Sequence, residues 1–137
     1  MKGLNIPAKE KSPKVIFDPD KKIFEMEGNS RPENVREFYY PIIDILRKYF
    51  EKISDNGDYD SYNETPFNFT FKLDYFNSAS AKFISDILVI IKDFTDVKLK
   101  IKVNWYFEDG DDDMKEVGED FSEMISMPFN FIMIQRN

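Results

Sequence analysis

The chain has 137 residues, 42% of them hydrophobic, and its 14 phenylalanines supply enough apolar surface for a packed domain rather than a disordered segment. It contains no cysteine and no histidine, which excludes disulfides, thiol chemistry and histidine-based catalysis or metal binding. The net charge of -7 disfavours nucleic acid as a partner, and no apolar run approaches the length of a membrane span. We therefore expect a cytoplasmic protein with one domain over residues 1–137, of which residues 1–13 form a flexible tail.

The first half of the chain predicts a β-hairpin followed by a long helix. The short apolar run Val15–Phe17 and the alternating segment Lys22–Glu27 flank the turn residues Asp18–Lys21, which is the pattern of a hairpin. Ser30, with a glutamate three residues later, predicts a capped helix start. Apolar residues at spacings of three and four then continue to Ile53, and the proline inside this pattern should kink or break the helix. A polar loop is expected over residues 54–66.

The second half alternates strands with helices. Phe67–Tyr75 and Lys98–Tyr106 both alternate apolar with polar residues, as strands with one buried face do. A helix is expected from about residue 80 to 93 between them. A weaker helix should follow the acidic loop Glu108–Asp113 and end near Met124, and Phe129–Gln135 should form the last strand.

This order of elements predicts an α/β fold. The expected sheet is mixed and five-stranded, with the N-terminal hairpin followed by parallel strands in chain order. The strands alternate instead of being apolar throughout, so we expect all three helices on one face and a solvated second face. Trp105 shares the apolar side of its strand and should therefore pack against the helices.

The acidic loop does not have the spacing of a calcium site. Gly110 comes too early, and Asp111, Asp112 and Asp113 are consecutive, so their carboxylates point in different directions. We expect no metal and no cofactor. Aspartate and glutamate number 26, and their spacing singles out no catalytic pair. A small carboxylate-dependent enzyme and a scaffold subunit without a switch are the alternatives to the function inferred below.

One short segment has more hydroxyl groups than its predicted position requires. Asn77-Ser78-Ala79-Ser80, here called the serine joint, lies where a strand should end and a helix should begin. Capping of that helix needs a single side-chain oxygen. A helix N-terminus also tolerates a phosphate, because its free N–H groups and dipole favour negative charge. On physical grounds alone, capping is the favoured role.

Three segments together resemble a known family. They are FDPDKKIFEMEGNSRPENVREFYYPIIDIL, LDYFNSASAKFISDIL and VNWYFEDGDDDMKEVGEDFSEMISMPFNF, and they resemble the SiaC family of bacterial regulatory phosphoproteins. The resemblance implies a fold similar to anti-sigma-factor-antagonist (STAS) domains and a non-enzymatic, phosphorylation-controlled protein-binding switch. It also implies a Ser/Thr protein kinase and a PP2C-type phosphatase as partners. The unphosphorylated form would bind an effector such as a diguanylate cyclase, in cyclic-di-GMP signalling.

The same resemblance assigns residues of the serine joint. In the family the modified hydroxyl directly follows the asparagine, which implies Ser78 as the phosphorylated residue. Family members often have a further hydroxyl at the next position, where this chain has alanine, so Ser80 is the fallback acceptor. The expected partner-binding residues are Tyr75, Phe76, Asn77, Ser78 and Ser80.

Overall fold

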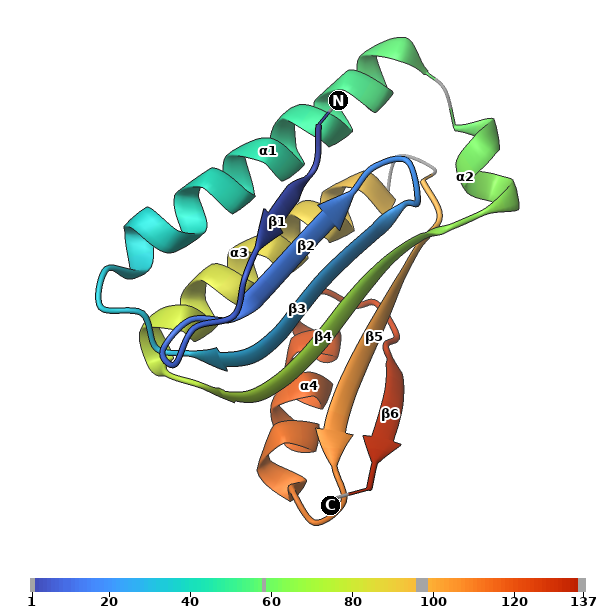
Figure 1. The fold of residues 1–137 in the computed structure, drawn as a ribbon. Helices are drawn as coiled ribbons and strands as arrows, with labels where there is room; N and C mark the ends of the chain where they lie inside the picture. Colours follow the sequence, from blue (N-terminus) through green and yellow to red (C-terminus); the bar gives the residue numbers. More distant parts are fainter. Residues whose placement is uncertain (1, 58, 96–98, 136–137) are drawn as a thin grey trace.

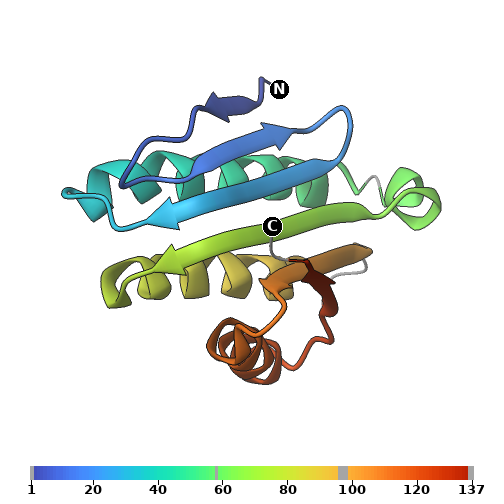
Figure 2. The ribbon, with the colours of Figure 1, turned by 60° about the horizontal axis from the view of Figure 1, so that its bottom comes forward.

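The computed structural model describes residues 2–57, 59–95 and 99–135. It consists of one six-stranded sheet with three long helices on one side, as Figures 1 and 2 show. The strands are β1 (Leu4–Ile6), β2 (Lys14–Asp18), β3 (Ile23–Ser30), β4 (Phe67–Phe76), β5 (Ile101–Glu108) and β6 (Asn130–Ile134). The helices are α1 (Val35–Asn56), the short α2 (Asp60–Glu64), α3 (Ser78–Thr95) and α4 (Asp112–Met124).

The topology confirms the predicted α/β class. The strands lie in chain order across the sheet. β2 and β3 form the expected antiparallel hairpin, and β3, β4, β5 and β6 are parallel neighbours. Each parallel step is made through one of the long helices, and same-sided crossovers move the chain one strand along the sheet each time. All the connections from a strand to a long helix therefore lie at the same end of the sheet, beyond the C-terminal ends of the parallel strands.

The N-terminal segment differs from the prediction of a flexible tail over residues 1–13. Leu4–Ile6 forms β1 and pairs antiparallel with β2, with Leu4 opposite Phe17 and Ile6 opposite Val15. Both apolar side chains pack against the core, while Asn5 is exposed. The sheet therefore has six strands instead of five. Three residues are too short to give a recognisable alternation, so pairing with a longer strand is what orders them.

The helices also depart from the prediction at two places. The expected loop over residues 54–66 contains α2, whose Tyr62 is buried against the end of the core. The start of α1 lies later than expected: Asn34 caps it by accepting a hydrogen bond from the Glu37 N–H at 3.2 Å. Ser30, predicted as the cap, is instead the last residue of β3 and is fully buried. Serine and asparagine can both cap a helix. Because the end of β3 is buried, Ser30 remains part of the strand and Asn34 becomes the cap.

A kink or a break was predicted at Pro41, and helix α1 continues through this residue without a break. Proline leaves one backbone acceptor in the preceding turn without its partner. The apolar face of α1 compensates for this loss, because Tyr39, Ile42 and Leu46 on both sides of the proline are fully buried. Among the described residues, no helix is both long enough and apolar enough to cross a membrane.

The core contains many aromatic residues and lies between the sheet and the helices. Trp105 of β5 is its largest fully buried side chain, as its position on the apolar side of the strand predicted. Its indole Nε1 donates a hydrogen bond of 2.9 Å to the Met114 carbonyl in α4. A Cβ atom at Gly118 of α4 would lie only 2.5 Å from the indole. Glycine is therefore needed at this position for α4 to approach β5 closely.

We predict that Trp105→Ala lowers the free energy of unfolding by roughly 3–5 kcal/mol, because it leaves a large cavity and removes the indole hydrogen bond to the Met114 carbonyl. Urea unfolding followed by circular dichroism measures this loss. Tyr40→Ala is the control, since this aromatic is 55% exposed and its truncation should cost less than about 1 kcal/mol. Equal losses in the two variants would contradict the proposed position of Trp105 in the core.

Candidate functional site

The serine joint lies at the end of the sheet that is formed by the C-terminal ends of the parallel strands. β3 and β4 finish side by side there, with Ser30 paired to Phe76. The Asn77 N–H donates a hydrogen bond of 3.0 Å to the Ser30 carbonyl, which extends the pairing into the joint. In open α/β sheets, binding sites are usually found beyond the carboxyl ends of the strands. The joint is therefore held by backbone bonds in a position where partners commonly bind.

Asn77 caps α3. Its side-chain Oδ1 accepts a hydrogen bond from the Ser80 N–H at 2.9 Å, and its carbonyl accepts the first helical hydrogen bond, from Ala81, also at 2.9 Å. These are the two bonds expected of a residue at the N-cap position. The helix start is thus satisfied without either serine hydroxyl, which leaves the two serines available for other roles.

The two serines have opposite environments. Ser78 is the first residue of α3 and is exposed to solvent, as is Ala79. Ser80 is fully buried. Its Oγ donates a hydrogen bond of 2.9 Å to the Ser30 carbonyl and accepts one of 2.8 Å from the Ser30 hydroxyl. In the folded chain Ser78 is therefore accessible from solvent, whereas Ser80 would first have to leave the core.

The hydrogen bonds of Ser80 belong to a buried hydroxyl network that also includes α1. Tyr39 Oη lies 2.5 Å from Ser30 Oγ, and it also lies 3.8 Å from the Met26 sulfur. Burial raises the pKa of Tyr39 above the usual value, although hydrogen bonding to Ser30 and Ser80 partly opposes this shift. Tyr39 therefore stays neutral at ordinary pH and acts as a structural hydrogen-bonding group.

The two aromatic residues before the joint also differ. Tyr75 is 50% exposed and is available for contact. Phe76 is partly buried, and its ring centroid lies 6.3 Å from those of both Trp105 and Phe121. Of the five residues expected to bind a partner, the structure exposes Tyr75 and Ser78, while Phe76 and Ser80 have structural contacts and Asn77 caps the helix.

A cavity of about 280 Å³ lies beside the joint, between the end of β4 and the start of α4. Its lining combines apolar and acidic side chains, namely those of Asp74, Tyr75, Phe76, Asp111, Asp113, Met114 and Val117. The fold thus places the acidic loop next to the serine joint, a proximity that the sequence did not predict. Asp111 caps α4, since its Oδ1 accepts a hydrogen bond from the Met114 N–H at 3.1 Å.

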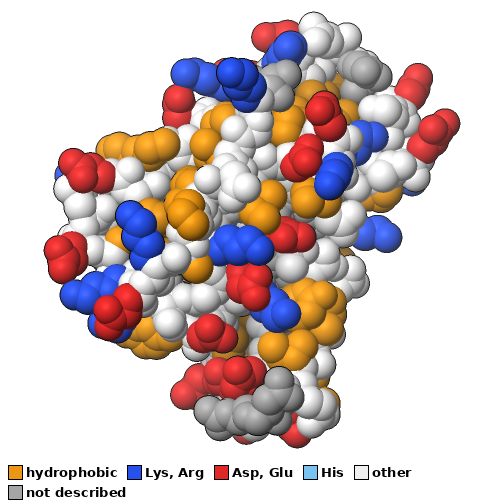
Figure 3. All heavy atoms as spheres, in the orientation of Figure 1, with side chains coloured by type: hydrophobic (Ala, Val, Ile, Leu, Met, Phe, Trp, Pro, Cys, Tyr) orange, Lys and Arg blue, Asp and Glu red, His pale blue; other side chains and the backbone are white. Residues whose placement is uncertain are grey.

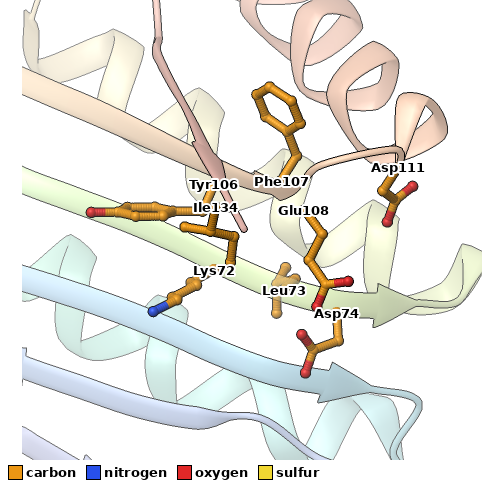
Figure 4. Close-up of a pocket in the computed structure, with 8 residues that line it drawn as sticks. All are labelled: Lys72, Leu73, Asp74, Tyr106, Phe107, Glu108, Asp111 and Ile134. Atoms are coloured by element: carbon orange, nitrogen blue, oxygen red, sulfur yellow. The ribbon is translucent and has the colours of Figure 1, made fainter. Parts of the chain in front are cut away.

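A second hollow of about 200 Å³ lies nearby and shares Asp74 and Asp111 with the first. Figure 4 shows Lys72 and Tyr106 toward one end of it and the carboxylates of Asp74, Glu108 and Asp111 toward the other. In the described part of the chain, no three Asp or Glu side chains are arranged so that they could hold a metal ion. The neighbourhood of the joint is therefore an acidic surface with two cavities.

Sequence reasoning missed two features of this region. Tyr40 of α1 is exposed, and its ring centroid lies 5.8 Å from that of Phe83 in α3, so a second exposed aromatic belongs to the helices that start beside the joint. The Ser30–Ser80 hydrogen bonds were also missed, because the two residues are 50 positions apart.

Comparison with known proteins places the chain in a family. A family model described as SiaC family regulatory phosphoprotein matches residues 6–134. The chain belongs to the SiaC family. It is also 26% identical over 129 residues to an uncharacterized protein of Pseudomonas aeruginosa (strain UCBPP-PA14), and the match covers 94% of each chain.

Solved structures show the same fold. Apo-SiaC from Pseudomonas aeruginosa is 24% identical, with a TM-score of 0.76 over 97% of this chain and 98% of that one. A chain in the crystal structure of the diguanylate cyclase SiaD in complex with its activator SiaC, also from Pseudomonas aeruginosa, is 22% identical. Its TM-score is 0.77 over 97% of this chain and 99% of that one.

The two serines of the joint should differ in their effects on stability. Ser80→Ala removes a hydroxyl from a buried network and takes one hydrogen-bond partner each from the Ser30 hydroxyl and the Ser30 carbonyl, so it should cost roughly 1–3 kcal/mol of unfolding free energy. Ser78→Ala removes an exposed hydroxyl that is not the cap and should change stability by less than about 0.5 kcal/mol. Chemical denaturation of the two matched variants measures the difference. A larger loss for Ser78→Ala would contradict the assignment of Asn77 as the cap.

Proposed function

We propose that this chain is a non-enzymatic, cytoplasmic signalling protein whose binding to an effector is switched by phosphorylation of Ser78. The observation that supports this most strongly is the contrast within the joint. In a member of a family of regulatory phosphoproteins, the hydroxyl directly after the capping asparagine is exposed, while the next hydroxyl, on Ser80, is buried and bonded.

A phosphate on Ser78 is compatible with the folded chain. The helix cap is supplied by Asn77, so modification of the next residue removes no capping bond. The group would lie in the first turn of α3, where the helix dipole favours negative charge. Phosphorylation should therefore change the surface of the protein and leave its fold intact.

A partner would sense the phosphate through charge and desolvation. Tyr75, three residues before Ser78 at the end of β4, lines the acidic cavity. An effector that binds the unphosphorylated form can pack against a neutral hydroxyl and the exposed ring of Tyr75, and exposed aromatic side chains often dominate binding energy. A phosphate adds a charge of about -1.5 to -2, and burying it without a counter-charge is costly.

The effector that we propose is a diguanylate cyclase, by similarity to the SiaC protein described as the activator of the cyclase SiaD. A Ser/Thr kinase would add the phosphate and a PP2C-type phosphatase would remove it, as the family resemblance implies. The output would then be control of cyclic-di-GMP synthesis. This chain would contribute a binding surface and no catalytic residues.

The test combines mapping of the phosphorylation site with binding measurements. Phosphate should map to Ser78 in protein taken from the native host. Ser78→Ala should bind the diguanylate cyclase of the same host as tightly as the unmodified protein does. Ser78→Asp, which adds a charge at the same position, should weaken binding at least tenfold, or by about 1.4 kcal/mol. Isothermal calorimetry with the purified proteins gives both affinities.

Asp113→Asn is the matched control, because it changes charge beside the joint without altering the hydroxyl. It should bind the cyclase within a few fold of the unmodified protein, and all three variants should unfold at similar denaturant concentrations. The assignment to Ser78 is wrong if Ser78→Asp binds as tightly as the unmodified chain and no phosphate maps to this residue.

A further inference from the structure

Strand β6 forms an open edge of the sheet. It is the last strand in the order, and in the described part of the chain it pairs with β5 alone. Residues 129–135 contain no charged side chain and no proline. Exposed edge strands are usually protected by such residues or by bulges, because their free backbone groups can pair with another strand. The other edge strand, β1, is only three residues long.

Strand β6 also presents apolar side chains on both faces. Ile132 pairs with Tyr106 on the helix-free face, and Met133 pairs with Phe107 on the face that carries α4. Met133 is 52% exposed. On the helix-free face, Figure 3 shows a hydrophobic patch over β5 and β6. A strand that is apolar on both faces and open along one edge has the composition of an interior strand of a sheet.

The charges around β6 do not favour a strongly basic or acidic partner. Lys72 lies over the ring of Tyr106 on one face, and Lys115 lies over the ring of Phe107 on the other, at 5.4 Å and 5.7 Å. These lysines offset the carboxylates at the end of β5. In a chain with a net charge of -7, this uncharged edge is a place where a second copy can approach without bringing like charges together.

We propose that β6 pairs antiparallel with β6 of a second copy and joins two six-stranded sheets across a two-fold axis. With Ile132 on the axis, Phe131 of each copy lies opposite Met133 of the other, on the face that carries α4. Methionine sulfur packs favourably against aromatic rings, so the strand is complementary to itself. This inference uses neither Ser78 nor the cyclase, and it stands or falls independently of the proposed switch.

Sedimentation of the full chain tests the proposal, with two matched methionine variants. The unmodified chain should form a dimer in a concentration-dependent manner. Met133→Lys places a charge in the apolar contact and should raise the dissociation constant at least tenfold. Met124→Lys makes the same change at a methionine of α4 that is 50% exposed and lies away from the edge, so it should leave the dissociation constant unchanged.

A single introduced cysteine tests the position of the axis. The chain has no cysteine of its own, so Ile132→Cys would place two thiols directly opposite each other, and an oxidised dimer should form readily. Glu27→Cys on the exposed face of β3 should not give such a dimer. The proposal is overturned if the unmodified chain stays monomeric at concentrations up to about 1 mM, or if its dimer is insensitive to Met133→Lys. Hydrogen-exchange protection of β6 that appears only after the cyclase is added would also overturn it, and would assign the edge to the effector.

Discussion

The hydrogen bonds between Ser30 and Ser80 hold the end of β3 against the first turn of α3, and the position of the exposed Ser78 depends on this contact. One hydroxyl at the end of β3 and one in the first turn of α3 bond each other, and the second also bonds the strand carbonyl. Tyr39 joins α1 to the same point. Each such bond contributes only about 1 kcal/mol net, yet leaving any member unpaired in the core would cost more. Two strand–helix connections are thereby fastened to each other.

This arrangement explains why the serine joint contains three polar residues where capping requires one. Asn77 caps the helix, Ser80 ties the helix to β3, and Ser78 is left exposed on a rigid support. A site that changes its charge without changing its backbone needs this kind of support, because the surrounding contacts must survive the modification. In the proposed switch, a partner would meet the added charge close to the exposed Tyr75.

Much of the fold could be predicted from local patterns. The alternation in β4 and β5 and the apolar spacing in α1 and α3 gave the strands, the helices and their order. The pairing of β1 could not be found in this way, because three residues carry no reliable period. The position of Ser30 was also missed, since a serine before a helix looks like a cap until the burial of the strand end is known. The proximity of the acidic loop to the joint depends on tertiary structure, which a single sequence does not display.

The most direct measurement is a binding titration of the diguanylate cyclase with protein that carries phosphoserine at position 78 only, before and after treatment with a PP2C-type phosphatase. The switch requires weak binding by the phosphorylated protein and full affinity after the phosphate is removed, with an unchanged far-ultraviolet circular dichroism spectrum in both states. Equal affinity before and after dephosphorylation would contradict it. A loss of binding accompanied by unfolding would contradict the claim that Ser78 acts on the surface alone.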